Sequence, residues 1–457
     1  MLKLNGYDSE KKKHRDMDTP LSEHHQNRAD RLDLLLLGAT GFTGTHCISY
    51  LLKFCHKYNL TWGVAGRSAE KLKDVLKASG KDIGTDLENI TIIVVDINSQ
   101  DDLLTMARQT KIVLNCTGPF RFLGEPVVKA CIASGTHYVD IDAEHQFMEK
   151  VQLELDEAAK EKGVYVISGC GFDSIPTDMG IVYVQQEFEG TLNSVVTYLE
   201  VCKEDGFKLE PTINYRTLES IVYAMANWHE LKDIRRKLFA TKTPIFEPKM
   251  KWRSWPHKAD IVNGWAVPLP LVDRSVAHRT QRHFYNIEEK RPIQTDVYFA
   301  VDSFFLFLLI YIALLALRYC VQFKFFRNLL LEHPKILTAS FITKDAPSEE
   351  KIANTSFQVT FHGKGWKANL PNKDDQYTIP CDSAIVGRVK GNSGYGVTCL
   401  ALVMSAITVI TEGDKIPGRK QRAGVLTPGA AFAKTSLIRN LNENGLTFEI
   451  ISRKNLN

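Results

Sequence analysis

The sequence predicts an α/β protein, with an N-terminal doubly wound parallel sheet and an α+β second domain that includes an apolar helical segment. Three observations predict this. Between residues 31 and 180, short apolar runs alternate with amphipathic segments, as in repeated strand–helix units. From about residue 194, apolar and polar residues alternate with the period of a half-exposed strand. Between residues 304 and 317 the chain carries no charge.

The parallel sheet is expected to contain six strands, with helices between them. The strands are predicted at residues 34–37, 60–65, 90–95, 112–115, 137–140 and 164–168. Helices are predicted at 45–52, 69–76, from 101 onward and at 125–133, the last ending at Gly135 as a C-cap. Ligands of such sheets bind beyond the carboxyl ends of the strands, so the loops after these strands form the candidate site.

Gly38-Ala-Thr-Gly41-Phe-Thr-Gly44 directly follows the first apolar strand and opens a helix. Gly38 permits the tight turn, Gly41 lets backbone N–H groups approach phosphates, and Gly44 lets the helix pack closely on the strand. A glycine-rich turn that binds nothing has the same pattern, so the neighbouring strand ends decide between the two. The motif predicts a Rossmann-type dinucleotide site that includes Gly38, Thr40, Gly41, Phe42, Thr43 and Gly44.

The loops after the next three strands complete this predicted site. The second strand ends in Gly-Arg67-Ser68, without an acidic residue for a ribose 2′-hydroxyl, so NADP(H) is favoured over NAD(H). A solvated Arg67 is the alternative. Asp96, after the third strand, is placed near the adenine or in a helix cap. Small residues that would let the nicotinamide half pass follow the fourth strand: Asn115, Thr117, Gly118 and Pro119.

The loops after the fifth and sixth strands hold the candidate catalytic residues. Asp142 and His145 follow the fifth strand, and Asp173 and Ser174 follow the sixth. A carboxylate or imidazole here is suited to proton transfer. The alternative is helix capping, with Asp142 capping the helix through Phe147 and Asp173 or Ser174 capping the next one. The Tyr-x-x-x-Lys pair of short-chain dehydrogenases is absent after the third and fourth strands.

Composition limits the partners. The net charge is +4 over 457 residues, and no basic stripe with interleaved aromatic residues is present, so no nucleic acid is expected. The nine cysteines form no C-x-x-C pair, which favours reduced thiols in a cytosol-facing protein without a bound metal. Residues 1–30 are polar, lack the apolar core of a signal peptide, and are expected to form a disordered leader.

Residues 181–385 are expected to form the α+β domain for substrate binding and dimerisation. Strands are predicted at 194–201 and 355–361 in an antiparallel sheet, with a helix at 217–226. Residues 386–457 are predicted as a helical segment that returns to the dinucleotide-binding domain. Its stretch 396–410 is apolar nearly all round and is therefore expected to be buried. Residues 424–430 are read as a loop near the cofactor or as a plain turn.

The apolar segment 298–327 has three interpretations: a buried core or dimer helix, an interfacial anchor, or a transmembrane span. A span needs about 20 apolar residues, and the uncharged part here is shorter. Asp302 would be costly in a bilayer, whereas the flank with Arg318, Lys324 and Arg327 suits lipid headgroups. These patterns favour a membrane or lipid-droplet surface as a partner.

The series of motifs resembles the animal members of the saccharopine dehydrogenase family. The resemblance runs from about Asp33 to the C-terminus, through Ala-Gly-Arg-Ser, Asn-Cys-Thr-Gly-Pro-Phe, Tyr-Val-Asp-Ile-Asp-Ala-Glu, Cys-Gly-Phe-Asp-Ser-Ile-Pro-Thr-Asp, residues 346–357 and the turn 394–396. It implies a Rossmann fold, redox activity and lipid-droplet association, with mitochondrial association as an alternative. The family's substrate-binding arginines cannot be placed on this sequence, and related bacterial members resemble trans-acting enoyl reductases that serve lipid assembly.

The sequence therefore predicts an NAD(P)H-dependent oxidoreductase acting on a lipid-linked or hydrophobic substrate at a membrane or lipid-droplet surface, in lipid or glycolipid metabolism. The alternative is a non-catalytic nucleotide-binding scaffold or sensor anchored at such a surface. Catalysis in the lysine pathway ranks below both. The substrate and the proton donor do not follow from the sequence.

Overall fold

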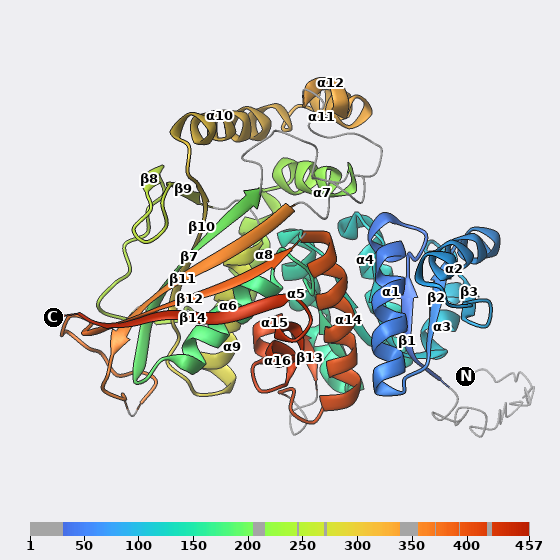
Figure 1. The fold of residues 1–457 in the computed structure, drawn as a ribbon, viewed down its shortest axis with the longest axis horizontal. Helices are drawn as coiled ribbons and strands as arrows, with labels where there is room; N and C mark the ends of the chain where they lie inside the picture. Colours follow the sequence, from blue (N-terminus) through green and yellow to red (C-terminus); the bar gives the residue numbers. More distant parts are fainter. Residues whose placement is uncertain are drawn as a thin grey trace, which may run out of the picture. The chain divides into compact units, whose positions relative to one another are not determined.

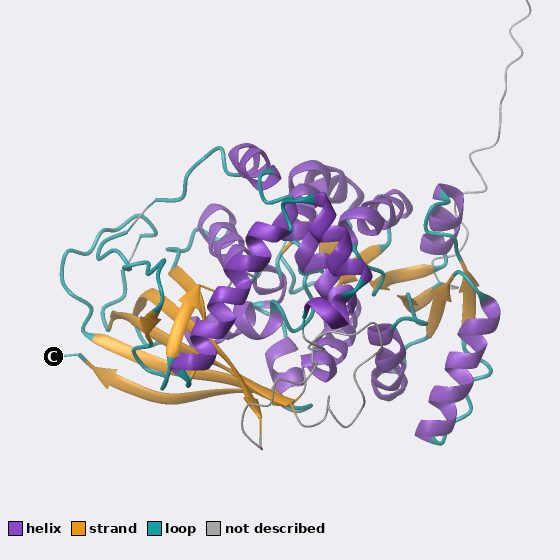
Figure 2. Cartoon of the chain, turned by 90° about the horizontal axis from the view of Figure 1, so that it is seen from above, coloured by secondary structure: helices purple, strands orange, loops and turns teal. Residues whose placement is uncertain are grey.

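The computed structural model describes residues 31–203, 215–244, 246–268, 272–338, 355–370, 372–392, 394–417 and 423–456. The leader predicted at 1–30 and most of the motif at 346–357 lie outside the described residues. Within these ranges the chain forms two seven-stranded sheets. Figures 1 and 2 show the sheets on opposite sides of a group of helices.

The first sheet is parallel throughout and has the strand order β13-β6-β5-β4-β1-β2-β3. Its strands are β1 (Leu32–Leu37), β2 (Trp62–Gly66), β3 (Thr91–Val94), β4 (Thr110–Asn115), β5 (His137–Asp140), β6 (Tyr165–Ile167) and β13 (Gly424–Leu426). In β1, an inner strand of this sheet, Leu34, Leu35 and Leu36 are fully buried. A strand buried on both faces is what an uninterrupted apolar run predicts.

Helices connect these strands and cover the sheet. They are α1 (Phe42–Tyr58), α2 (Ala69–Ile83), α3 (Gln100–Arg108), α4 (Phe120–Ser134) and α5 (His145–Lys162). Helix α6 (Ile175–Glu187) follows β6, leads into the second sheet and packs against it. Local chemistry sets their ends: Ser68 and Ser99 accept backbone N–H groups as N-caps of α2 and α3. Gly135 ends α4 in the left-handed conformation, as the sequence predicts.

The second sheet has the order β14-β12-β11-β7-β10-β9-β8. Its strands are β7 (Thr191–Lys203), β8 (His257–Lys258), β9 (Trp265–Pro268), β10 (Gln294–Val301), β11 (Thr355–Trp366), β12 (Ser383–Asn392) and β14 (Leu446–Asn455). The expectation of an antiparallel sheet is wrong at one place, because β10 runs parallel to β7. A parallel pair needs a long crossover, and α9 (Asp273–Ile287) belongs to the connection that leads into β10.

The C-terminal segment is shared between both sheets, and the prediction that it is helical is wrong in two places. Helix α14 (Gly394–Glu412) is buried over most of its length, as its all-round apolar pattern predicts. The predicted loop at 424–430 instead forms β13, which pairs with β6, and α15 (Pro428–Phe432). After α16 (Leu437–Asn442), β14 pairs with β12 of the second sheet. A three-residue strand is too short for periodicity to reveal.

The apolar segment forms α10 (Phe304–Cys320), followed by α11 (Lys324–Glu332) and α12 (Pro334–Leu337). Figure 1 shows these helices along one margin of the molecule, with α7 (Tyr215–Ala226) beneath them and α8 (Glu230–Leu238) further in. One side of α10 packs on β9 and β10 through Phe307, Val267 and Val301. Phe307 is the only buried side chain of α10, so within the described chain this helix is not a core helix.

Candidate functional site

The glycine turn after β1 leaves no room for side chains at two of its three glycines. A Cβ on Gly38, whose φ is +88°, would lie 2.8 Å from Thr117 Cγ2. A Cβ on Gly44 would lie 2.2 Å from the Gly38 carbonyl oxygen, because α1 packs directly on the turn. At Gly41, the N-cap of α1, no side chain caps the helix. The first turn of α1 thus offers backbone N–H groups at the positive end of a helix dipole, which suits phosphate binding.

The ends of β2 and β3 present Arg67 and Asp96. Arg67 is exposed, and no ion pair of Arg67 is found within the described part of the chain. Ser68 Oγ accepts the Lys71 N–H at 3.3 Å as the cap of α2. Asp96 Oδ1 accepts the backbone and side-chain N–H groups of Asn98, both at 3.0 Å, so this carboxylate shapes its own turn. Ser99 and not Asp96 caps α3.

Asn115, at the end of β4, is fully buried, and its side chain forms hydrogen bonds within the protein. Its Nδ2 donates to Tyr138 Oη at 3.0 Å, and its Oδ1 accepts the Thr117 N–H at 2.9 Å. The Thr117 hydroxyl also contacts this oxygen. Asn115 therefore positions the loop through Gly118 and Pro119, the N-cap of α4, and its contact with a cofactor stays a prediction. The loop backbone and Thr117 face the glycine turn.

Carboxylates after β5 hold neighbouring backbone in place. Asp140 Oδ1 accepts the N–H groups of Asp142 at 3.0 Å and Gly169 at 2.9 Å, which ties the ends of β5 and β6 together. Glu144 accepts the Phe120 N–H at 2.9 Å and the Arg121 N–H at 3.2 Å, and thereby caps α4 from another loop. Burial raises the pKa of Asp140 to about 6 and also raises the pKa of Glu144.

The sequence predicts that Asp142 caps the following helix, but in the structure it does not. Glu144 is the N-cap residue of α5. The Asp142 Oδ1 accepts the Glu144 N–H at 3.0 Å, and its Oδ2 is buried with no partner among the described residues. Burial, then the charges of Glu144 and Asp140, raise the pKa of Asp142 well above its usual range. His145 begins α5 and meets the Trp228 ring edge-on at 6.0 Å.

The loop after β6 lies beside a group of buried acids. The sequence does not predict that these acids lie close together. Ser174 is the N-cap residue of α6, but its buried Oγ makes no cap hydrogen bond and has no partner among the described residues. Burial raises the pKa of Asp173 to about 6. Thr177 Oγ1 donates to Asp273 Oδ1 at 2.6 Å, and burial raises the pKa of Asp273 to about 8.

Asp178 completes this acid cluster, which comprises Asp173, Asp178 and Asp273. Its Oδ2 accepts the Thr280 hydroxyl at 2.8 Å and the Gly429 N–H at 2.7 Å, while Oδ1 is buried and has no partner in the part of the chain that the structure describes. Burial raises its pKa to about 6. Asp273 and Thr280 come from α9, about a hundred residues after α6 in the chain. Spacing along the sequence carries no signal for such a contact.

Comparisons with known proteins agree with this geometry. Residues 34–167 match the model of the saccharopine dehydrogenase NADP binding domain. The human saccharopine dehydrogenase-like oxidoreductase is 36% identical over 92% of this chain and 97% of its own. This chain belongs to the family of saccharopine dehydrogenase-like oxidoreductases. A Caenorhabditis elegans member, named lipid droplet localized protein, is 32% identical over 93% of this chain and 100% of its own. Apo saccharopine dehydrogenase (L-Glu forming) from Saccharomyces cerevisiae shares the fold, with a TM-score of 0.50 and 13% identity over 93% of this chain and 100% of its own.

The chain is thus a member of an oxidoreductase family with an NADP-binding domain. The glycine cradle fits a dinucleotide, because Cβ atoms at Gly38 and Gly44 would fill the space that the turn and α1 need. Arg67 at the end of β2 is suited to the 2′-phosphate that distinguishes NADP(H). The contact residues themselves remain predictions from the fold.

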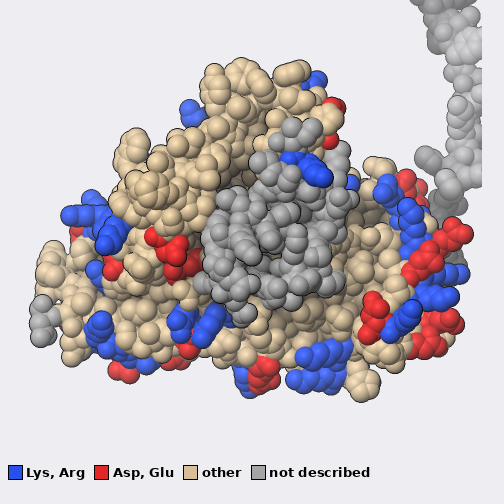
Figure 3. All heavy atoms as spheres, turned by 45° about the horizontal axis from the view of Figure 1, so that its top comes forward, with Lys and Arg blue, Asp and Glu red and all other residues tan. Residues whose placement is uncertain are grey.

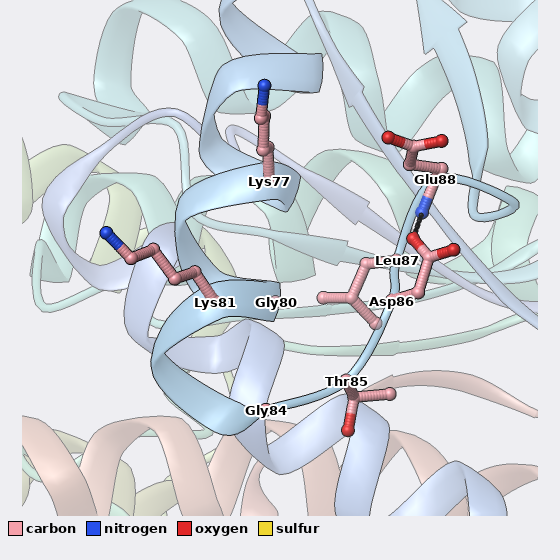
Figure 4. A pocket seen from close by; sticks show the side chains of 8 residues that line it. All are labelled: Lys77, Gly80, Lys81, Gly84, Thr85, Asp86, Leu87 and Glu88. Carbon is pink, nitrogen blue, oxygen red and sulfur yellow. Dashed lines mark hydrogen bonds between the residues drawn. The ribbon is translucent and has the colours of Figure 1, made fainter.

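Two surface hollows lie away from this edge of the sheet. One, of about 270 Å³, is lined by Lys77 and Lys81 of α2 and by residues 84–88 (Figure 4). The 15-residue helix begins at Ala69, directly after Ser68, so its far end is about 20 Å from the cofactor edge. The other, of about 510 Å³, lies between residue 190 and β12 and β14. Within the described part of the chain, no group of three His, Cys, Asp or Glu residues is arranged to hold a metal.

Proposed function

We propose that this protein is an NADP(H)-dependent oxidoreductase that reduces a lipid-linked or hydrophobic substrate at a membrane or lipid-droplet surface. One observation carries the proposal: α10 exposes apolar side chains along its whole length. Phe305 is 82% exposed and Phe325, at the start of α11, is 71% exposed. We call this surface the apolar ridge; it comprises Phe305, Leu308, Leu309, Ile312, Leu315, Tyr319, Phe323, Phe325 and Phe326.

The ridge has the properties of an interfacial surface. A contiguous exposed apolar patch on a folded domain marks a site of interaction. Figure 3 shows the ridge as a raised surface on which Lys and Arg gather only at the margins. Arg318, Lys324 and Arg327 follow the uncharged stretch, where anionic headgroups would meet them. Burial of this surface in lipid would remove it from water.

The length of α10 favours lying in the interface over spanning the bilayer. Its 17 residues extend about 25 Å, less than the roughly 30 Å hydrocarbon core. The inner side of the helix, through Phe307, is packed on the second sheet and cannot face lipid. Helix α14 is long and apolar enough to cross a membrane by composition, but most of it is buried inside the protein.

Helix α7 joins the ridge to the edge of the nucleotide-binding sheet. Towards the sheet, the Ser220 hydroxyl donates to Glu144 at 2.8 Å, and Gln146 Nε2 donates to the Ala224 carbonyl at 2.8 Å. Towards the ridge helices, α7 packs through one apolar cluster of Leu218, Val222, Val321, Leu330 and Leu331. Helix α7 therefore contacts both the ridge helices and the loop after β5, which supports a substrate that moves from lipid at the ridge towards the cofactor edge.

NADPH, when bound, supplies the hydride of the reduction. The chain must then supply a proton, and carboxyl groups with raised pKa values are suited to hold one near neutral pH. Asp173, with a pKa raised to about 6 by burial, lies on the loop at the carboxyl end of β6. We therefore assign Asp173 as the candidate proton source, with the other acids of the cluster behind it.

The membrane step is tested with liposomes that contain anionic phospholipid. We expect the double variant Phe305→Asp/Leu309→Asp to lose liposome binding in flotation by at least about tenfold, because each change places a charge where apolar surface would enter lipid. Ile379→Asp, at an exposed apolar side chain outside the ridge, is the matched control. Unchanged binding of the double variant would contradict the proposal.

The redox step is tested separately, by following oxidation of NADPH when lipid extract is added. The proposal expects turnover by the unmodified protein and its loss in Asp173→Asn. Tight NADPH binding with no turnover across lipid classes would instead favour the nucleotide-binding scaffold.

A further inference from the structure

A second exposed surface, separate from the apolar ridge, combines aromatic and basic side chains. It is formed by residues 249–258, which run into β8, and we call it the aromatic–basic loop. Four of its residues are Lys or Arg and none is Asp or Glu; the basic residues are Lys249, Lys251, Arg253 and Lys258. Trp255, near the centre of the loop, is 75% exposed. The cofactor site described above makes no use of this loop.

Contacts with β10 hold the backbone of the loop on the second sheet. The Arg253 N–H donates to Tyr298 Oη at 3.0 Å. On the other side of Trp255, the His257 Nδ1–H donates to the Trp255 carbonyl oxygen at 3.0 Å. The His257 ring also meets the Tyr298 ring edge-on, with 4.8 Å between the ring centroids. The residues on both sides of Trp255 are therefore held by one tyrosine, while the indole between them stays exposed.

Two of the basic side chains have no acidic partner in the described part of the chain. Lys249 and Arg253 each form an ion pair with an acid that flanks the loop, at 3.3 and 3.0 Å. Lys251 and Lys258 are exposed, and neither forms an ion pair with a residue that the structure describes. The loop therefore presents positive charge around the exposed indole of Trp255. Such a surface is suited to a membrane–water interface, where tryptophan is enriched and anionic headgroups attract Lys and Arg.

The loop adjoins the first residue of the ridge helix. Lys258 pairs with Trp265 in the register of β8 and β9, and the Trp265 ring centroid lies 4.9 Å from that of Phe304, the first residue of α10. Figure 1 shows β8 and β9 beneath the start of α10. The basic residues within 318–327 lie at the other end of this helix. Basic side chains therefore flank the apolar ridge at both ends.

We propose that the aromatic–basic loop is a second membrane contact, which selects surfaces that carry anionic phospholipid. The inference rests on the proposed function, because it needs the ridge to lie in lipid. Trp255 then enters the boundary between headgroups and acyl chains, where indole rings are favoured. Lys251 and Lys258 meet the anionic headgroups, and each is worth about fivefold in binding. With basic groups at both of its ends, α10 lies parallel to the surface.

The charge of the loop favours a lipid surface over a second copy of this chain as the occupant. A two-fold contact places the same patch of both copies face to face. Through this loop it would bring Lys251 and Lys258 of one copy towards those of the other, and like charges oppose each other. An anionic lipid surface instead complements the lysines of the loop and the basic residues within 318–327 at the same time.

The first test compares flotation of the full-length protein with vesicles of phosphatidylcholine alone and with vesicles that also contain phosphatidylserine. We expect Lys251→Gln/Lys258→Gln to bind the anionic vesicles roughly tenfold to thirtyfold more weakly and the neutral vesicles as the wild type does. Lys77→Gln/Lys81→Gln, which removes the same charge from exposed positions of α2, is the matched control and should bind both kinds of vesicle like the wild type. High salt should abolish the difference between the variant and its control.

The second test measures whether Trp255 enters the lipid. Brominated phosphatidylcholine in the anionic vesicles should quench tryptophan emission of the wild type, and a large part of this quenching should be lost in Trp255→Phe. The phenylalanine keeps an aromatic ring that can enter lipid. Flotation of this variant should therefore stay close to that of the wild type, so the loss of quenching reports the position of residue 255 and not a loss of binding.

Equal binding of the lysine variant and its α2 control to anionic vesicles, or unchanged quenching in Trp255→Phe, would overturn this inference. Shielding of Trp255 from acrylamide that rises with protein concentration and needs no vesicles would show a contact with a second copy, and would also overturn it. The ridge is judged separately, by loss of binding to both kinds of vesicle in Phe305→Asp/Leu309→Asp. Full binding of that ridge variant would contradict the proposed function and, with it, the role of the loop as a second contact.

Discussion

At the end of β2, Arg67 presents an exposed guanidinium next to the helix that Ser68 caps. A 2′-phosphate there would form charge-assisted hydrogen bonds worth roughly 1.5–3 kcal/mol. We therefore expect Arg67→Ala to weaken NADPH binding roughly tenfold to a hundredfold and to leave NADH binding unchanged. Titration calorimetry with both nucleotides measures this ratio. Equal losses for NADPH and NADH would show that Arg67 does not read the 2′-phosphate; Lys77→Ala, further along α2, is the control.

Asp178 gives a pH-dependent term in stability. Burial raises its pKa in the folded protein to about 6, from 3.8. Below about pH 4 the carboxyl is protonated in both states. Between pH 4 and 6 the folded protein holds a proton that the unfolded chain has lost, so the free energy of unfolding falls as pH rises and then stays lower.

The Asp178→Asn variant tests this term. The amide keeps an acceptor oxygen for Thr280 and Gly429, and it replaces the partnerless Oδ1 by a neutral group. We expect the variant to match the wild type at pH 4 and to be more stable at pH 8 by on the order of 1–3 kcal/mol. Thermal unfolding across this pH range measures the difference, with Asp82→Asn at an exposed site as control. A variant that is less stable than the wild type at pH 8 would contradict the assignment.

At the scale of the element, Glu144 stabilises a helix that begins 24 residues earlier in the chain. Its carboxylate accepts two N–H groups of the first turn of α4, and the Ser220 hydroxyl of α7. We expect Glu144→Ala to lower the free energy of unfolding by about 1–3 kcal/mol, because buried donors lose their acceptor. Glu144→Gln, which keeps one oxygen, should lose less. Chemical unfolding of both variants, beside Glu157→Ala on the exposed side of α5, measures the cost; equal stability of all three would exclude the cap.

The elements that the sequence predicts correctly are those with a local signal. Apolar runs and caps located β1 to β6 and their helices within a few residues, and the all-round apolar pattern predicted the burial of α14. The signal fails where a partner lies far away in sequence. Strand β13 is a strand because β6 offers an edge. Asp142 loses the expected capping role because the N-cap position of α5 falls two residues later, at Glu144.

The same limit applies to the candidate site. The roles of Gly38 and Gly44 can be predicted from the sequence, because the lack of space for a side chain follows from the local turn itself. The sequence predicts Asn115 as a cofactor contact, but it does not predict the hydrogen bonds that its amide makes with Tyr138 and Thr117. The acid cluster forms only when α9 packs against α6. The spacing of residues along the sequence therefore cannot predict that Asp273 belongs to it.

At the scale of the whole molecule, the chain enters the nucleotide-binding part twice. Residues 31–187 supply six strands, and the C-terminal segment returns with α14, which packs against β1, β4, β5 and α1, and with β13 at the sheet edge. Leu400, Val403 and Ile407 of α14 are nearly fully buried and belong to the same apolar core as side chains of β1 and β4. Without this helix, one side of the sheet would expose its core to water.

A fragment of residues 31–187 should therefore not fold into a stable nucleotide-binding domain, although it contains every predicted cofactor residue. We expect it to aggregate or to lack cooperative unfolding, because the apolar surface that α14 covers remains exposed. Joining residues 394–442 to the fragment through a flexible linker restores α14 and β13, and this fusion should be soluble and should be stabilised by NADPH in thermal unfolding. The same fusion with Leu400→Asp and Val403→Asp is the matched control. A soluble, NADPH-binding fragment 31–187 would show that the first pass of the chain folds alone, and that the returning segment serves only to join the two sheets.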